Sequence, residues 1–478
     1  MKCALLLLLL VSAPAVAQDP NAGIAALNAT QSFSVAVDPR VELLTAVARL
    51  AEFEEYRHQL CAWPYQAASD AWFAPHKDHA AVRALQRLRA KRGVSYDAIP
   101  SLAIHLTNPP ELAERIPFDS KPERLDARYP LDETRAFLKE LRSFATDSKA
   151  AAFFASQQTT WDAINARLTA RLAGSPSPEW LRTFFGITQA GSCSVIPGLL
   201  FGPLSCGVGV RFGANMPEEL RPVLGCWEFD TQGLPVYGKS TEMLFAHELA
   251  HSWANAVVDA AAVQLDPIGQ RLFELSETQM RRETYGTGRI VLYETLVRVA
   301  VIRCFFATVS LEAANEQARN DVSRGFTWVP ALARAVSAYE ADRTKWPQLA
   351  DFVPEIVRVL QAEAERLAGL AAKTPRLLSI TPATGTNDVD PALDTMTLVF
   401  DRPMRAGGWS FVAAKEDLPE FIGKPSFDTE RKVLMVKIRL EPGRSYRFQL
   451  NSERSLGFAA ADGTPLAPVR VQFNVRAQ

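Results

Sequence analysis

Two of the six histidines in this chain of 478 residues stand four positions apart, in the segment HELAH at residues 247–251. On an α-helix, residues four apart share a face, so the imidazoles of His247 and His251 can both reach one metal ion. Glu248 is rotated by about 100° from His247 and can reach a water molecule bound to that ion. The pattern predicts a zinc ion held by the two histidines, with Glu248 as the general base. The alternative is a pair of buried core histidines beside an ion-paired Glu248.

The third zinc ligand has to come from outside this motif. A catalytic zinc usually keeps three protein ligands and one open position. The elongated form of the motif requires a glycine and a third histidine where this chain has Ala254 and Val257, and no histidine follows His251. The third ligand is therefore a carboxylate, a tyrosine or a histidine from the N-terminal region.

Glu294 is the best candidate for this ligand. It is the only acidic residue in the segment 288–306, whose apolar residues run all round a predicted helix and so indicate a buried one. A buried carboxylate is costly unless it is paired or bound to a metal. The alternative partner is Arg298, one turn further on. The two interpretations combine if Arg298 orients Glu294 toward the metal.

Other side chains compete for a role at this site. The rival carboxylates lie in a more polar segment or on the motif helix itself: Glu274, Glu277, Glu283 and Asp259. A hydrolase also needs a hydrogen-bond donor for the oxyanion that forms opposite the metal. Tyr285, just before the second helix, is the candidate for this catalytic role, and Tyr237, just before the first helix, is another. Either tyrosine is alternatively an ordinary loop aromatic.

The surrounding sequence changes character along the chain. Apolar residues at three- and four-residue intervals predict helices over 41–172 and again from the motif to 372. Residues 181–238 are rich in Gly, Val, Phe and Cys and predict a small sheet of hairpins. Short strands with period-two alternation predict a β-sandwich over 376–478. The expected fold class is α+β, with a mainly helical domain over 41–372 that contains the small sheet, followed by the sandwich.

The N-terminus predicts export. Lys2, an apolar run and the small residues at 15–17 are typical of a cleaved signal peptide over 1–17, followed by a loose leader over 18–40. We therefore expect a secreted or periplasmic protein. No later segment is long and apolar enough to predict a membrane span. The net charge of −1, without a run of Lys and Arg, gives no indication of a nucleic-acid partner.

Five cysteines remain after the expected cleavage: Cys61, Cys193, Cys206, Cys226 and Cys304. In an oxidising compartment some of them should pair, and the odd number leaves at least one thiol free. Because three of them cluster in the Gly-rich region, a bridge among Cys193, Cys206 and Cys226 is the first expectation. Cys304 lies in an apolar helical run and is expected to be a buried free thiol.

The motif residues resemble a known class of enzymes. His247, Glu248 and His251, with Glu294 on a second helix, are similar to the glutamate-zincin class of zinc metallopeptidases. More narrowly, the segments FAHELAHSWAN and YETLVRVAV look like those of secreted bacterial proteins that carry an uncharacterised metallopeptidase domain, over about residues 40–370. The resemblance implies a zincin-like domain in which the two histidines and Glu294 bind zinc and Glu248 is the general base.

The resemblance has one clear departure and one extension. Well-known members carry an N-E-x-x-x-D pattern around the third ligand, whereas here Tyr293 precedes Glu294 and residue 298 is Arg. The extension is C-terminal, where the segment ITPATGTNDVDPALDTMTLVFDRPM resembles the start of bacterial Ig-like domains. Such domains usually act as spacers or adhesion modules, which implies contact with the cell envelope.

The expected function is that of a secreted zinc-dependent metallohydrolase, and a peptidase is the first expectation. Glu248 would deprotonate the attacking water and then pass the proton to the leaving amine. The expected partner is a peptide or protein substrate, whose strand could lie along an edge of the small sheet. Two alternatives stay open. One is a non-catalytic cell-surface or binding protein on a former peptidase scaffold, and the other is a zinc hydrolase of non-peptide amides or esters.

Overall fold

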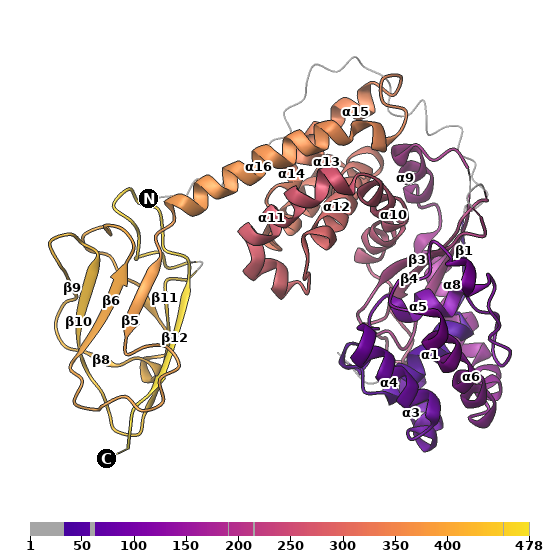
Figure 1. Ribbon diagram of the computed structural model, residues 1–478, viewed down its shortest axis with the longest axis horizontal. Helices are drawn as coiled ribbons and strands as arrows, with labels where there is room; N and C mark the ends of the chain where they lie inside the picture. The colour runs from indigo at the N-terminus through magenta and orange to yellow at the C-terminus, as the bar shows by residue number, and fades with distance from the viewer. Residues whose placement is uncertain (1–32, 58–62, 190, 214–215, 453, 478) are drawn as a thin grey trace. The chain divides into compact units, whose positions relative to one another are not determined.

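The chain folds into a mixed α+β structure, which confirms the expected class at this coarse level. The computed structural model describes residues 33–57, 63–189, 191–213, 216–452 and 454–477. They divide into two compact units, one ending at Gln361 and the other beginning at Ala362 (Figure 1). The predicted signal peptide lies outside the described residues, so export of the chain stays a prediction.

The first unit begins with helices, as the sequence pattern over 41–172 predicts. These helices are α1 (Pro39–Leu50), α2 (Glu54–Arg57), α3 (Pro64–Phe73), α4 (Ala80–Arg92), α5 (Ala98–Ile104), α6 (Leu131–Asp147), α7 (Ala150–Ser156), α8 (Gln158–Leu172) and α9 (Ser177–Phe185). Helix α1 starts where the Asp38 side chain accepts a hydrogen bond from the Arg40 N–H, next to a proline in the first turn. Leu43, Leu44 and Val47 of α1 are fully buried in the hydrophobic core of this region.

A small sheet links these helices to the motif helix. Its strands are β1 (Ser34–Val35), β2 (Ser192–Gly198), β3 (Cys206–Val210) and β4 (Glu219–Gly225). In the described part of the chain their order is β1-β2-β4-β3. Strand β2 is parallel to both β1 and β4, whereas β3 and β4 are antiparallel. Strand β3 therefore lies at one edge of the sheet.

Two expectations about this region need correction. Residues 181–185 belong to α9 rather than to the sheet, because Leu181, Phe184 and Phe185 are spaced to bury one helical face. Among the described strands of this sheet, β3 and β4 are the one pair that is antiparallel and consecutive in the chain. The part of the predicted loose leader that the structure describes is also ordered, because β1 pairs with β2 and the flanking Phe33 and Val37 are buried.

The second set of helices carries the motif. It comprises α10 (Ser240–Ala260), α11 (Ala262–Arg282), α12 (Gly288–Thr308), α13 (Leu311–Ser323), α14 (Val329–Ala335), α15 (Ser337–Ala341) and α16 (Val353–Lys373). Helix α10 packs against β3 and β4 and also against α12, as Figure 1 shows. The boundary between the two units falls inside α16, earlier than the sequence boundary between 372 and 376. Among the described residues, no helix has the length and hydrophobicity that crossing a membrane requires.

Helix α12 is the buried centre of this helical group. Every residue from Glu294 to Cys304 is buried, as its all-round apolar sequence predicts. The helix begins at Thr287, whose side chain accepts a hydrogen bond from the Ile290 N–H. Helices α10, α11, α13 and α14 all pack against α12. Its charged side chains are therefore held in fixed surroundings.

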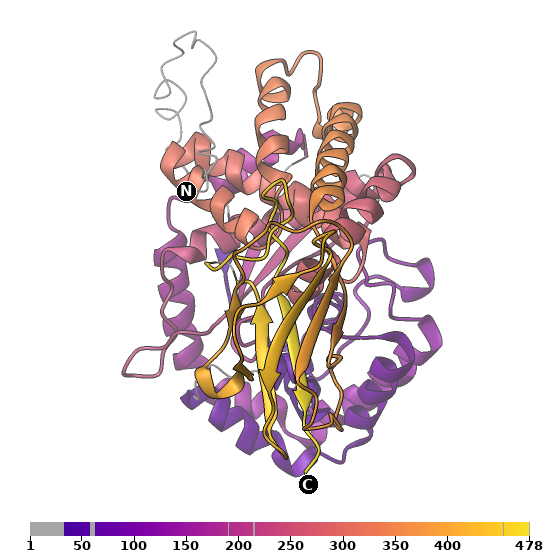
Figure 2. The same ribbon diagram turned by 90° about the vertical axis from the view of Figure 1, so that its left-hand side faces the viewer.

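The second unit consists of short strands in two sheets. They are β5 (Leu377–Thr381), β6 (Thr395–Phe400), β7 (Phe411–Val412), β8 (Glu420–Phe421), β9 (Ser426–Phe427), β10 (Val433–Arg439), β11 (Ser445–Leu450) and β12 (Val469–Asn474). One sheet has the order β5-β6-β10-β8, with β9 also pairing with β10, and the other has the order β12-β11-β7. Their inward side chains, among them Leu398, Val436, Phe448 and Phe473, form one core. The strands of this unit are the orange and yellow arrows in Figure 2. This two-sheet arrangement is the architecture that the period-two pattern predicts.

The expected disulfide among Cys193, Cys206 and Cys226 is wrong for this structure, in which all three are free thiols. Strands β2 and β3 lie on opposite sides of β4, and Cys193 and Cys206 pair with different residues of it, so they are more than two strand spacings, about 9.6 Å, apart. A disulfide needs Cα atoms within about 7 Å. Cys226 follows the end of β4 and its Sγ lies 3.6 Å from the Tyr237 hydroxyl. Cys304 is a buried free thiol, as predicted.

Candidate metal centre

Helix α10 presents its two motif histidines on one face. The Nε2 atoms of His247 and His251 lie 3.3 Å apart. The helix is held in place from both sides, because Phe245, Leu249 and Val258 are fully buried between the sheet and the neighbouring helices. The side chains of both histidines are mostly but not completely buried. The pair is thus rigidly placed and still reaches a solvent-facing space.

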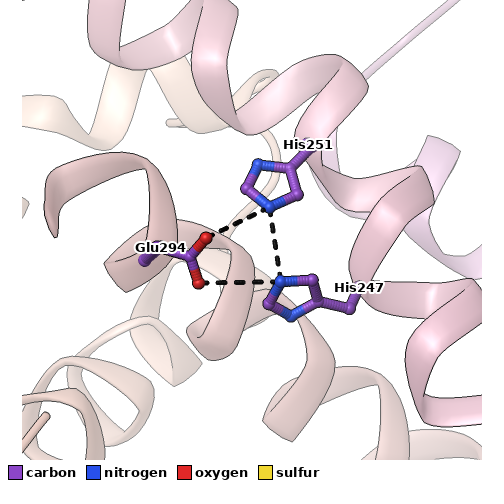
Figure 3. Close-up of side chains that lie close together, drawn as sticks. All are labelled: His247, His251 and Glu294. Carbon is purple, nitrogen blue, oxygen red and sulfur yellow. Dashed lines mark hydrogen bonds and ion pairs between the residues drawn. The ribbon is translucent and has the colours of Figure 1, made fainter. Parts of the chain in front are cut away.

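Glu294 of α12 points at this pair (Figure 3). Its Oε2 lies 3.6 Å from His247 Nε2, and its Oε1 lies 3.5 Å from His251 Nε2. One donor atom from each of the three side chains falls within 4.8 Å of the other two, a cluster that could hold a metal ion. Among the described residues no other group of His, Cys, Asp and Glu converges in this way. The side chains that the sequence singles out as ligands therefore meet at one point.

Burial and mutual contact set the protonation of the three side chains. Burial lowers the pKa of His247 to about 3, so its imidazole is neutral at pH 7. Burial also acts to lower the pKa of His251, but the contact with Glu294 outweighs it and raises that pKa to about 9. Although burial alone would raise the pKa of Glu294, contacts with His251, His247 and Arg298 hold it well below its usual range. The buried carboxylate of Glu294 is therefore balanced by two positive charges, the proton of His251 and the guanidinium of Arg298.

Polar neighbours orient two of the candidate ligands. The Nδ1 of His251 lies 3.1 Å from Asn255 Oδ1, one turn further along α10. Since an amide oxygen only accepts, Nδ1 carries the proton, and this hydrogen bond aims Nε2 at Glu294. On the other side, Nη2 of Arg298 donates to Glu294 Oε2 over 3.0 Å. The predicted Glu294–Arg298 pair is therefore present together with the histidine contacts, and the two interpretations combine.

A cleft opens beside the three side chains. It has a volume of about 610 Å³, and His247, Glu248, His251 and Glu294 all line it. Glu248 is only 5% exposed, and its burial raises its pKa to about 8. At that pKa the carboxyl group is mostly protonated at pH 7, and a cation bound beside it would lower the pKa and favour the ionised form that accepts a proton. The cleft thus brings together a possible metal site, a possible base and room for a ligand.

The two walls of the cleft come from different parts of the chain. One wall consists of residues from α10 to α13 and the loops between them, among them Tyr285 and Arg324. The facing wall comes from much earlier in the sequence, and Tyr96, Asp97 and the start of β3 belong to it. Sequence analysis missed this second wall. No local pattern around residue 96 distinguishes it from any other turn, because only the tertiary fold brings it to the motif.

Strand β3 can approach the motif helix only because residue 207 is a glycine. A Cβ atom at Gly207 would lie 2.0 Å from the carbonyl oxygen of Glu248 and 3.1 Å from the Cβ of His251. Both contacts are too short, and the first is with the backbone of α10. Gly207 therefore fixes the spacing between the edge strand and the helix that carries the candidate site.

Replacing Gly207 by Ala is expected to destabilise the first unit by about 1–3 kcal/mol, because β3 or α10 has to move. The displacement should also weaken metal binding, since it acts on the backbone between His247 and His251. Thermal unfolding and metal titration measure the two effects. Gly238→Ala is the matched control, because a Cβ there meets nothing within 4 Å. Equal stability of the two variants would contradict this role of Gly207.

Of the other candidate tyrosines and carboxylates, some line the cleft and others lie outside it. Tyr285 lines the cleft, and its hydroxyl accepts a hydrogen bond from Arg298 Nη2 at 3.1 Å. Tyr237 does not line this cleft but packs against the N-terminal core. The rival carboxylates bind other partners: Glu274 contacts Gln270, Glu277 contacts Arg281, Glu283 contacts Arg324, and Asp259 contacts Arg289 and Tyr293. Of these four, only Glu283 lines the cleft.

Comparison with known families adds one match. Residues 237–359 match a family described as "Domain of unknown function (DUF4932)". The matched segment contains Glu248, all three candidate ligands and Tyr285, but neither Asp97 nor β3. No curated protein matches the chain.

Solved structures of surface-layer proteins show a distant likeness. "Structure of surface layer protein SbsC, domains 1-6" is 14% identical, with a TM-score of 0.18, over 50% of this chain and 38% of that chain. "Crystal structure of the N-terminal part of the bacterial S-layer protein SbsC" is 15% identical, with a TM-score of 0.17, over 50% of this chain and 65% of that chain. This chain thus spans well under half the length of the first of these structures. At such TM-scores the likeness bears on neither fold nor function.

Proposed function

We propose that this protein is a zinc-dependent hydrolase that cleaves peptide bonds. The observation that carries the proposal is the convergence of His247, His251 and Glu294 at the side of an open cleft, with the buried Glu248 beside them. Two imidazoles and one carboxylate leave a fourth position free, which is the ligand set typical of catalytic rather than structural zinc. All these residues fall within the segment 237–359, and the family that this segment matches has no known function.

The spacing of the donor atoms supports zinc in particular. Ligand atoms at 2.0–2.1 Å from a tetrahedral zinc are about 3.3–3.4 Å apart. In this structure the two imidazole Nε2 atoms are 3.3 Å apart, and the two oxygens of the Glu294 carboxylate lie 3.5 Å from the Nε2 of His251 and 3.6 Å from that of His247. Neutral imidazole and ionised carboxylate are the forms that bind metal, so His247 and Glu294 are already in the binding form and His251 would release a proton as zinc binds. His247, His251 and Glu294 therefore fit a zinc ion with little rearrangement.

The residues of the cleft divide the chemistry of hydrolysis among them. Bound zinc supplies a Lewis acid that polarises the scissile carbonyl group and acidifies water. Glu248 accepts the proton of the attacking water and returns it to the leaving amine. The Tyr285 hydroxyl donates a hydrogen bond to the carbonyl oxygen as negative charge develops on it. Glu248 is buried and forms no ion pair among the described residues, so its ionised form would be free to act on water.

The substrate is proposed to be an extended peptide segment. Strand β3 pairs with β4 on one side only among the described strands, and its first residues, Cys206 and Gly207, line the cleft. A peptide can hydrogen-bond to the free edge of such a strand and lie past the metal site. The two-sheet second unit is proposed to act as a spacer or a contact with the cell envelope, as its resemblance to Ig-like domains implies.

Metal analysis combined with a peptide-library digest tests the proposal. We expect about one zinc ion per chain, loss of cleavage on chelation and recovery when zinc is restored. His251→Ala should lose the metal, whereas His76→Ala, a histidine outside the cleft, should keep it. A chain that purifies and titrates without zinc would overturn the proposal. A chain that binds zinc but cleaves no peptide, amide or ester would instead indicate a binding protein on this scaffold.

A further inference from the structure

One guanidinium nitrogen connects the metal site to the candidate oxyanion donor. Arg298 lies on α12, one turn after Glu294, and its side chain is almost completely buried. Its Nη2 donates to Glu294 Oε2 over 3.0 Å and to the Tyr285 hydroxyl over 3.1 Å. A single atom of this chain thus contacts both a candidate ligand and a candidate catalytic group.

The far side of this guanidinium is anchored deep in the protein. Its Nη1 donates to Oδ1 of Asp321, which is fully buried in α13. Gln317 donates to the same carboxylate oxygen over 3.1 Å, and the Phe326 ring lies 4.3 Å from Arg298 Cζ. These contacts fix the plane of the guanidinium from behind. The direction of Nη2 is therefore set by the core and does not depend on a bound ligand.

This arrangement determines where the Tyr285 proton points. A phenol hydroxyl has one proton, and because Tyr285 accepts from Arg298, that proton is free for another acceptor. Among the described residues the Tyr285 hydroxyl has no other hydrogen-bond partner, and the residue lines the cleft. Its ring packs edge-on against Phe326, with centroids 5.8 Å apart. The O–H is thereby directed into the space beside the metal site.

We propose that Arg298 is a positioning residue that couples the third zinc ligand to the oxyanion donor: it orients the Glu294 carboxylate and directs the Tyr285 proton toward the substrate carbonyl. The inference rests on the proposed function and adds to it a role for the buried arginine at position 298. Lysine cannot replace it, because a single ammonium group does not span Asp321 on one side and both Glu294 and Tyr285 on the other.

The test compares Arg298→Lys, Tyr285→Phe and the double variant with the wild-type protein. Zinc affinity is measured by chelator competition, and kcat and KM are measured at saturating zinc. Arg298→Lys should weaken zinc binding by about 10–100-fold, the usual effect of losing a partner of a metal ligand. Tyr285→Phe should lower kcat by about 10²-fold and leave zinc affinity and KM nearly unchanged.

The decisive measurement is kcat of the double variant. If Arg298 acts on catalysis through Tyr285, the double variant at saturating zinc should have a kcat no lower than that of the less active of the two single variants. Multiplied losses of kcat, or an unchanged zinc affinity in Arg298→Lys, would overturn the coupling. Both outcomes leave the wild-type enzyme active and zinc-loaded, so they are distinct from failure of the proposed function.

Two further variants separate coupling from general damage to the core. If Arg298→Lys does not fold, the double variant Arg298→Gln with Asp321→Asn replaces it. This variant removes both charges of the buried Arg298–Asp321 pair, so residue 321 is not left as an unpaired carboxylate. It should show the same losses of zinc affinity and kcat. Arg303→Gln is the matched control, because Arg303 is a buried arginine of the same helix that pairs with Glu340 away from the cleft. It should keep wild-type zinc affinity and kcat, and a loss of both there would count against a specific role of Arg298.

Discussion

Replacing Glu248 by Gln is expected to lower kcat by between about 10² and 10⁴ while zinc stays bound. The carboxyl group of Glu248 is buried beside the candidate ligands, and its ionised form, which a bound cation would favour, can accept a proton from water. An amide of the same shape cannot take a proton. Because Glu248 itself is not among the converging donor atoms, its loss should leave the metal site intact.

The measurement is kcat and zinc content on the same preparation of the Glu248→Gln protein. Glu242→Gln is the control, since Glu242 lies on the same helix and its carboxylate accepts hydrogen bonds from Ser175 and Ser177 outside the cleft. Retained cleavage in Glu248→Gln would exclude this residue as the base. Loss of zinc would show instead that Glu248 holds the metal site together.

The second large effect is expected at the third ligand. Zinc sites with four ligands bind with about 10–16 kcal/mol, or roughly 3–4 kcal/mol for each ligand. Replacing Glu294 by Gln should therefore weaken zinc binding by about 10²–10³-fold. The substitution also leaves the guanidinium of Arg298 without one of its two carboxylate partners. Chelator competition measures the affinity directly.

Glu283→Gln provides the comparison for this result. Glu283 lines the same cleft but pairs with Arg324, at 2.6 Å, and does not converge with the histidines. Its replacement should leave zinc affinity within about twofold of wild type, because no ligand is lost. A stronger effect from Glu283 than from Glu294 would mean that the third ligand has been assigned to the wrong carboxylate.

The candidate site could be predicted from sequence because its signals are local. The spacing of His247 and His251 defines one helical face without knowledge of the fold. Glu294 stood out because a single carboxylate in an apolar helix needs a partner, and the structure supplies both the histidines and Arg298. Each argument needed only a few turns of one helix. The period-two strands of the second unit were predictable for the same reason.

What depends on distant parts of the chain could not be predicted. Strand β1 consists of two residues, and only its pairing with Ser194 and Val195 makes it part of a sheet. The same holds for Asp97, which reaches the cleft only because α5 packs near β3. The expected disulfide is wrong because Cys193 and Cys206, although close in the sequence, lie on strands at opposite sides of β4. Spatial order in a sheet is set by long-range packing rather than by local pattern.

The origin of the two cleft walls has a consequence for proteins that share this architecture. The residues proposed to carry out the reaction all lie within 237–359, whereas Asp97 and β3 face them from outside that segment. If the proposed function holds, the reacting groups lie in one stretch of the chain and one wall of the cleft lies in another. Proteins that keep the first stretch and exchange the second should retain one bond-breaking chemistry while they diverge in what they accept.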